Sequence, residues 1–211
     1  MEPFQDIESR LIPLDMTNVD TDQIIPKQFL KLIQKTGYGG FLFYDWRFDN
    51  SGNPKKEFVL NEPKYNERQV LLTRDNFGCG SSREHAVWAL YDYGIRVVIA
   101  SSFADIFYNN CFKKGLLPIY LGRDETEYLF DLVKNDDAVA DISLANQTIS
   151  ISEKIIHFDI DLTRKKMLLE GIDEIGYTLS FNDKILNYER ASKVADYDKL
   201  LVKNDSPFGD S

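Results

Sequence analysis

The residues best suited to chemistry form a glycine- and serine-rich segment at 75–86, DNFGCGSSREHA. Gly78 and Gly80 allow a tight turn and a close approach of the backbone to a ligand. The N–H groups at the start of the helix expected next, together with the helix dipole, favour an anion. Arg83 adds a planar guanidinium that suits a carboxylate or a phosphate. This segment therefore predicts a binding site for a small anion.

The same residues also fit a purely structural role. Ser81 and Glu84 have the spacing of a capping box, in which Ser81 would be the N-cap of the helix, and Ser82 is an alternative cap. The segment is not a phosphate-binding loop, a dinucleotide-binding fingerprint or a nucleophile elbow. The pattern alone leaves a functional turn and a capped helix equally open.

Metal-ligating residues are scarce in this chain. It has only two cysteines, Cys79 and Cys111, and two histidines, His85 and His157, without any paired spacing. Two cysteines cannot supply the three thiolates that an iron–sulfur cluster needs. We therefore expect no metal ligands here; Cys79 is interpreted as a small residue beside the turn and His85 as a buried structural residue.

The elements around the turn predict an α/β fold. After a first strand at 7–14, a polar loop at 18–26 (NVDTDQIIP) leads to a short helix at 29–34. From residue 69 strands and helices alternate, which is typical of parallel βαβ units. Closely spaced strands follow in a meander. The expected elements are strands at 69–73, 97–100, 117–121, 138–144, 147–152, 155–160 and 165–170, and helices at 83–93, 103–112, 125–134, 173–179 and 182–193.

Residues 35–68 have no regular periodicity. A stretch of that length is usually functional or mobile, and its six aromatic residues between 38 and 48 indicate that it docks on a surface. We expect one domain at 1–202 with a long mobile loop at about 35–68, followed by a flexible tail at 203–211.

Composition excludes several classes of protein. The 211-residue chain carries 25 Lys and Arg against 34 Asp and Glu, a net charge of −9, which argues against binding to nucleic acid or to an anionic membrane. No apolar run approaches the roughly 20 residues that span a bilayer. The N-terminus does not resemble a signal peptide, and with only two cysteines we expect a cytoplasmic protein.

A family resemblance extends this interpretation. The heptapeptide at 80–86, GSSREHA, resembles the signature of the swivelling domain of the aconitase superfamily, and residues 18–26 resemble a second signature. At this spacing, in a chain of about 200 residues, the pair resembles the small subunits of 3-isopropylmalate dehydratases. Matches continue at 40–48, 103–107, 109–110, 115–118 and 173–176. The resemblance implies a three-layer β/β/α swivelling domain with mixed parallel and antiparallel strands.

The resemblance also implies a reaction. It is the isomerisation of 2-isopropylmalate to 3-isopropylmalate through isopropylmaleate, a dehydration followed by rehydration in leucine biosynthesis. The partner implied is a large subunit, in a heterodimer, whose 4Fe–4S cluster acts as a Lewis acid on the leaving hydroxyl. The substrate implied is a small dicarboxylate, and the chain alone would be inactive.

Residue roles follow from the resemblance position by position. Ser81 would remove the proton from the carbon next to a carboxylate, and Asp22 would orient or shuttle protons. The implied substrate-binding residues are Asp20, Thr21, Gly80, Ser82 and Arg83. Phe29, Leu30 and Leu32 would belong to the segment that selects the substrate side chain, and Arg47 would contact the partner. Open alternatives are a related hydro-lyase acting on citraconate (2-methylmalate) or homoaconitate, and a non-catalytic anion-binding module.

Overall fold

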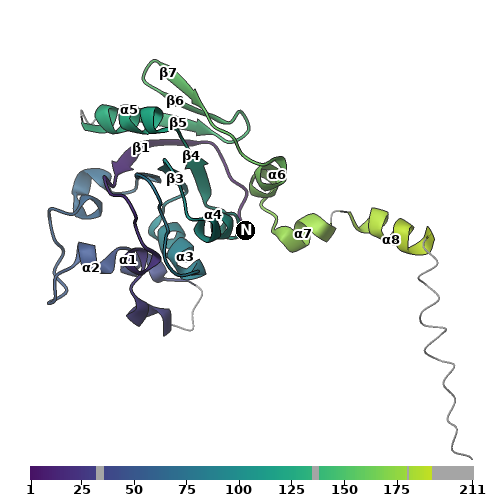
Figure 1. The fold of residues 1–211 in the computed structure, drawn as a ribbon, viewed down its shortest axis with the longest axis horizontal. Helices are drawn as coiled ribbons and strands as arrows, with labels where there is room; N and C mark the ends of the chain where they lie inside the picture. Colours follow the sequence, from purple (N-terminus) through teal and green to yellow (C-terminus); the bar gives the residue numbers. More distant parts are fainter. Residues whose placement is uncertain (32–35, 135–137, 180, 192–211) are drawn as a thin grey trace, which may run out of the picture. The chain divides into compact units, whose positions relative to one another are not determined.

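The computed structural model describes residues 1–31, 36–134, 138–179 and 181–191 (Figure 1). It divides the chain into two units, Met1–Ile172 and Asp173–Ser211. The second unit holds helices α7 (Glu174–Leu179) and α8 (Asn182–Ala191), and the predicted tail at 203–211 lies outside the described residues. The extent of the domain predicted at 1–202 stays a prediction. Within the described part of the chain, no helix has the length and apolarity needed to cross a membrane.

The first unit is built on a seven-stranded mixed sheet in the order β4-β3-β2-β1-β5-β6-β7. Strands β1 to β4 run parallel, and β5 to β7 form the antiparallel meander that the sequence predicts. Their bounds are β1 Ile7–Pro13, β2 Val70–Leu72, β3 Val97–Ala100, β4 Leu117–Tyr120, β5 Val139–Ser143, β6 Thr148–Ile151 and β7 Lys154–His157.

Strand β1 belongs to both halves of the sheet. Its first residues, from Ile7 to Arg10, pair with β5, and Leu11 to Pro13 pair with β2. The halves also share a core, since Leu11, Val70 and Ile99 lie in one buried cluster with Ile142 and Ile149. The sheet thus curls, and its antiparallel half packs as a second β layer on the parallel half. This confirms the β/β/α arrangement.

The opposite face of the parallel strands carries the helical layer. Ile12, Leu71 and Val98 face a second buried cluster, to which helices α3 (Glu84–Tyr93) and α4 (Asp105–Lys114) contribute. Helix α5 (Arg123–Lys134) packs in the first cluster through Leu129 and Phe130. Because β1 to β4 run parallel, the loops that follow them lie at the same edge of the sheet, and the candidate site is formed there.

The strand predicted at 165–170 is wrong, because these residues belong to helix α6 (Leu162–Glu170). Asp161 caps this helix by accepting hydrogen bonds from the backbone N–H groups of Thr163 and Arg164, each at 3.0 Å. Gly171, at φ +67°, ends it. The apolar run Met167–Leu169 resembles a strand in sequence, but the cap directs the chain into a helix.

Residues 36–68 have local structure only and lie on the α3 side of the core. Their elements are the 3₁₀ helices η2 (Tyr38–Phe41), η3 (Val59–Asn61) and η4 (Pro63–Tyr65) and the short helix α2 (Tyr44–Arg47). Tyr38, Leu42 and Phe43 are buried in the same cluster as α3, so the docking of the aromatic side chains is confirmed. The mobility of this stretch stays a prediction.

Gly39 explains how closely this stretch approaches α3. A Cβ atom there would lie 2.6 Å from the backbone carbon of Asp92, so only glycine fits. The Asp92 carboxylate also accepts hydrogen bonds from the backbone N–H groups of Gly37 and Tyr38, at 2.8 and 3.1 Å.

Candidate active site

Two segments that are far apart in the sequence run side by side at the carboxyl ends of β1 and β2. The backbone N–H of Asn18 donates to the carbonyl of Asp75 at 2.9 Å, and that of Gly78 donates to Val19 at 2.8 Å. The N–H of Thr21 donates to the carbonyl of Cys79 at 2.8 Å. This ladder joins the two family-like signatures into one surface.

The ladder ends at the catalytic serine predicted from the sequence. The buried Thr21 side chain donates from Oγ1 to the backbone carbonyl of Ser81 at 2.9 Å. Asp20 and Cys79 also form an isolated parallel bridge. The structure therefore brings Asp20, Thr21 and Ser81 together, while the roles predicted for them stay predictions.

Two glycines give the turn its shape. Gly78 and Gly80 have φ values of +77° and +89°, which strain any other residue. A Cβ at Gly80 would lie 2.3 Å from a carboxylate oxygen of Asp20, and one at Gly78 would lie 2.1 Å from the Phe107 ring. The turn therefore packs directly against Asp20 on one side and α4 on the other.

The capping prediction for α3 is wrong. Arg83 is the N-cap residue, with extended backbone and no side-chain cap, so Glu84 is the first residue of the helix. Glu84 thus lies too early in the helix to complete a capping box with Ser81, and the left-handed backbone of Gly80 together with the Thr21 bond holds Ser81 in the turn. Ser81 and Ser82 are exposed, and among the described residues neither hydroxyl has a hydrogen-bond partner. Both are left free for a ligand.

A capping box does exist, but in the other segment. Asp20 Oδ1 accepts from the backbone N–H of Asp22 at 2.6 Å, while the Gln23 side chain accepts from the backbone N–H of Asp20 at 2.8 Å. This box starts the short helix α1 (Thr21–Ile24) and points Asp22 toward the turn. The spacing Asp20-x-x-Gln23 is the signal that could have predicted it.

Asp22 and Arg83 meet between the two segments. Arg83 Nη1 forms an ion pair with Asp22 Oδ1, and Lys27 Nζ lies 3.2 Å from Asp22 Oδ2. The Arg83 side chain is only 11% exposed, so this pair is partly shielded from water. Because Asp20 and Asp22 offset Arg83 and Lys27, the turn is less electropositive than the sequence indicates.

The residues predicted to select the substrate or contact the partner lie on different elements. Phe29 and Leu30 lie on the 3₁₀ helix η1 (Lys27–Lys31), and Phe29 stacks on Phe41 with ring centroids 4.2 Å apart. Leu32 lies outside the described residues. The Arg47 guanidinium donates from Nε to Asn61 Oδ1 at 3.1 Å and lies over the Tyr93 ring. Arg47 thus links α2 to η3 and α3, and its contact with a partner stays a prediction.

Cys79, Cys111 and His85 have surroundings that favour structural roles. Burial, and then the charge of Asp20, raises the pKa of the Cys79 thiol, and burial raises that of Cys111 well above its ordinary value. Neither is poised as a thiolate nucleophile. The His85 ring packs against Tyr38 and Trp88, with centroids 5.3 and 4.6 Å apart.

Comparisons with known proteins identify the family. A family model described as the aconitase C-terminal domain matches residues 1–124. Proteins named 3-isopropylmalate dehydratase small subunit are 53% identical in Brevibacillus brevis, over 90% of this chain and 98% of theirs, and 52% identical in Aromatoleum aromaticum, over 96% and 100%. The chain belongs to the family of 3-isopropylmalate dehydratase small subunits.

A solved structure of a 3-isopropylmalate dehydratase has the same fold. The crystal structure of 3-isopropylmalate dehydratase from Methanocaldococcus jannaschii matches with a TM-score of 0.60 and 29% identity, over 88% of this chain and 99% of that one. The family likeness inferred from residues 18–26 and 80–86 is therefore confirmed over most of the chain. Members are subunits of a hydro-lyase of leucine biosynthesis.

The small-subunit site is an open surface. The turn at 78–83 does not line the pocket of about 570 Å³ between the N-terminus, Tyr91 and Arg96. The turn differs from this pocket in its chemistry: Ser81, Arg83 and Asp22 lie together in the site, whereas Arg96 in the pocket is already engaged, donating to the carbonyls of Tyr91 and Ile95.

Proposed function

We propose that this chain is the small subunit of a 3-isopropylmalate dehydratase and that it isomerises 2-isopropylmalate to 3-isopropylmalate together with a large subunit, in a heterodimer. The observation that carries the proposal is the junction of the two signatures: Thr21 binds the backbone of Ser81 while Asp22 pairs with Arg83. The substrate is inferred from the relatives, which are 3-isopropylmalate dehydratase small subunits. The same proposal includes leucine biosynthesis as the pathway and the cytoplasm as the location.

Ser81 is proposed as the base that takes the proton from the carbon next to a substrate carboxylate. Its hydroxyl is exposed, and its backbone is fixed by Thr21 at 2.9 Å. A serine must lose its own proton to act in this way, so it needs nearby positive potential. The start of α3 supplies this potential, and Arg83 adds to it as far as its pair with Asp22 leaves its charge available.

Gly80, Ser82 and Arg83 are proposed to bind the substrate carboxylate. The hydroxyl of Ser82 is exposed and has no hydrogen-bond partner among the residues that the structure describes, and the fork of Arg83 has further N–H groups beyond the one paired with Asp22. An arriving carboxylate shares or displaces the Asp22 pair, which couples substrate binding to the position of Asp22. Asp22 then orients or shuttles protons, while Asp20 and Thr21 hold the turn in shape.

The 4Fe–4S cluster is proposed to lie on the large subunit. When bound there it supplies a Lewis acid for the departing hydroxyl. The residues of this chain do not fit such a cluster: within the described ranges, no three His, Cys, Asp or Glu side chains gather to hold a metal ion, and the whole chain has two cysteines. The part of this chain is therefore to bind, orient and deprotonate the substrate.

Enclosure and selectivity are proposed to come from the partner and from η1. A second surface over Ser81 and Ser82 would exclude water and strengthen the contacts of Arg83. Phe29 and Leu30, with Leu32 of the same segment, offer apolar side chains for the isopropyl group, and Arg47 is proposed near the partner.

The test is to express the chain with and without the large subunit, reconstitute anaerobically with iron and sulfide, and assay dehydration of 2-isopropylmalate. We expect activity only from the complex. Ser81→Ala should lower turnover by about 10²–10⁴-fold without changing partner binding. Ser152→Ala is the matched control, because Ser152 is exposed in the turn between β6 and β7, outside both site segments and outside residues 36–68. Activity of the chain alone, near-normal turnover of Ser81→Ala, or a preference for citraconate or homoaconitate would each contradict the proposal.

A further inference from the structure

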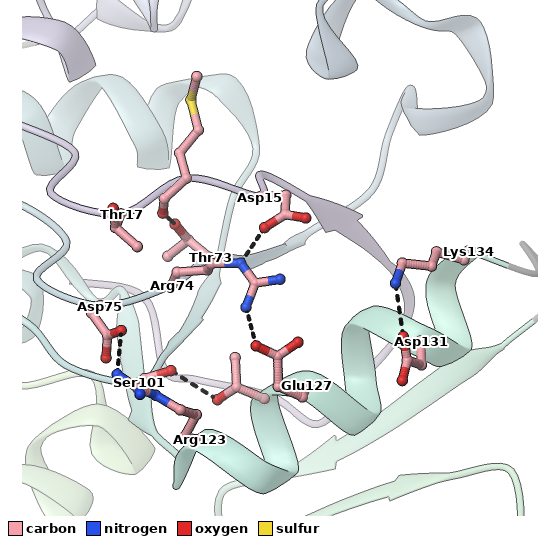
Figure 2. A network of polar contacts seen from close by, with 12 residues as sticks. Asp15, Thr17, Thr73, Arg74, Asp75, Ser101, Arg123, Glu127, Asp131 and Lys134 are labelled. Atoms are coloured by element: carbon pink, nitrogen blue, oxygen red, sulfur yellow. Dashed lines mark hydrogen bonds and ion pairs between the residues drawn. The ribbon is translucent and has the colours of Figure 1, made fainter.

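Arg74 forms ion pairs with two carboxylates where the two site segments leave strands β1 and β2 (Figure 2). The Arg74 guanidinium pairs through Nε with Asp15 and through Nη1 with Glu127. It also lies over the Phe130 ring, with Cζ 4.4 Å from the centroid. Asp15 follows β1, Arg74 follows β2, and Glu127 lies on α5, so one side chain joins three elements.

The ladder of hydrogen bonds that ends at the candidate active site starts next to Arg74. Thr73 Oγ1 and the backbone N–H of Arg74 both donate to the carbonyl of Met16, at 3.1 and 3.2 Å. From there the pairing continues through Asn18 and Asp75 toward Thr21 and Ser81. Arg74 lies seven positions before Ser81, and Asp15 lies seven positions before Asp22.

We infer that Arg74 is a positioning residue for the reaction. By tying Asp15 to Glu127, it anchors both site segments on helix α5 and sets how Ser81 lies relative to Asp22. This inference rests on the proposed function of Ser81 and goes beyond it, because Arg74 itself does not contact the turn.

The neighbouring ion pairs do not have this architecture. Arg123 pairs with Asp75 at 3.2 Å but is 77% exposed, and Lys134 pairs with Asp131 within α5 alone. Exposed pairs of this kind contribute little. The Arg74 side chain is 24% exposed, and its planar fork contacts two carboxylates at once, which the point charge of a lysine cannot reproduce.

The test uses the reconstituted complex and measures kcat and KM for 2-isopropylmalate, the unfolding midpoint and the affinity for the large subunit. Arg74→Gln should lower kcat by about 10–100-fold, because misplacement of a reacting group by about 1 Å costs on that order. KM should change less than about threefold, since Ser82 and Arg83 remain. Arg74→Lys should recover only part of kcat.

Glu127→Gln supplies a milder second variant in the Arg74 clamp, the cluster of Arg74 with Asp15 and Glu127, because the Glu127 side chain is half exposed. It should lower kcat in the same direction, and the double variant should be no worse than Arg74→Gln, because both changes break one unit. Lys166→Gln is the matched control: it removes a cation from an exposed pair with Glu170 inside helix α6, which carries neither site segment, and it should leave kcat unchanged.

A kcat for Arg74→Gln within about twofold of the wild type overturns the inference. So does a loss that is fully additive with Glu127→Gln, or one matched by loss of folded complex at the assay temperature. Ser81→Ala, assayed in parallel, separates the two ideas. If Ser81→Ala is inactive and Arg74→Gln is normal, only the role of Arg74 fails; if Ser81→Ala is active, the proposed function fails and the inference with it.

Discussion

Substitution of Gly80 tests how tightly the turn packs on Asp20. Gly80→Ala introduces two costs. The backbone at φ +89° is left-handed, which costs a residue with a Cβ about 1–2 kcal/mol. The new methyl would also lie 2.3 Å from the Asp20 carboxylate, which must move and release the cap of α1, worth about 1 kcal/mol. The total is about 2–3 kcal/mol of lost stability.

Two glycines elsewhere in the chain serve as matched controls. Gly52 has φ +82° with no atom within 4 Å of a built Cβ, so Gly52→Ala measures the backbone strain alone. Gly40 has equal space and no positive φ, so Gly40→Ala should be neutral or slightly stabilising. Urea unfolding at constant m-value gives each free energy.

The reasoning also predicts an effect on activity. Because Asp20 starts the helix that carries Asp22, Gly80→Ala should lower kcat/KM by at least about tenfold, measured below the unfolding transition. If Gly80→Ala costs no more stability than Gly52→Ala, the carboxylate yields freely and the packing argument is refuted. A large loss of stability with normal kcat/KM would show that Asp20 shapes the fold but not the site.

Three further predictions follow from the same geometry. Arg83→Lys should raise KM because a lysine cannot keep the Asp22 pair and bind a carboxylate with two prongs; steady-state kinetics check it, and unchanged kcat and KM would remove Arg83 from the site. Residues 36–68 should exchange amide hydrogens faster in the isolated chain than in the complex, and equal exchange in both would contradict a role at the partner surface. Since burial and Asp20 raise the pKa of the Cys79 thiol, iodoacetamide should alkylate Cys79 slowly at pH 7–8, and the rate should rise when the pH exceeds the ordinary thiol pKa. The fully buried Cys111 should react more slowly still. Rapid labelling of Cys79 at neutral pH would contradict this.

The parts of the fold that sequence predicts well are those where local pattern and tertiary packing agree. The buried strands at 97–100 and 117–120 and helix α3 with its Gly94 terminus are examples, since their apolar periodicity and end signals coincide. Helix α6 was missed because a short apolar run does not distinguish strand from helix without its cap, Asp161.

The site residues were predicted by type, but their partners were not. The Thr21–Ser81 hydrogen bond and the Arg83–Asp22 pair join positions about 60 residues apart, and single-sequence periodicity carries no signal for such contacts. The Arg74 clamp was missed for the same reason. The parallel βαβ pattern begins at residue 69 and does not include β1, so the sequence did not predict that the loops after β1 and β2 share one edge.

The double pairing of β1 has a consequence for how the chain is made. Ile7 must wait for Ile142, which is synthesised about 135 residues later, and Leu11 needs only Val70. On the ribosome, the carboxyl half of β1 can therefore find its partner while the amino half still presents an open edge. The segments that hold Asp22 and Ser81 lie on the early side of that division, so the candidate site can take shape before β1 pairs with β5.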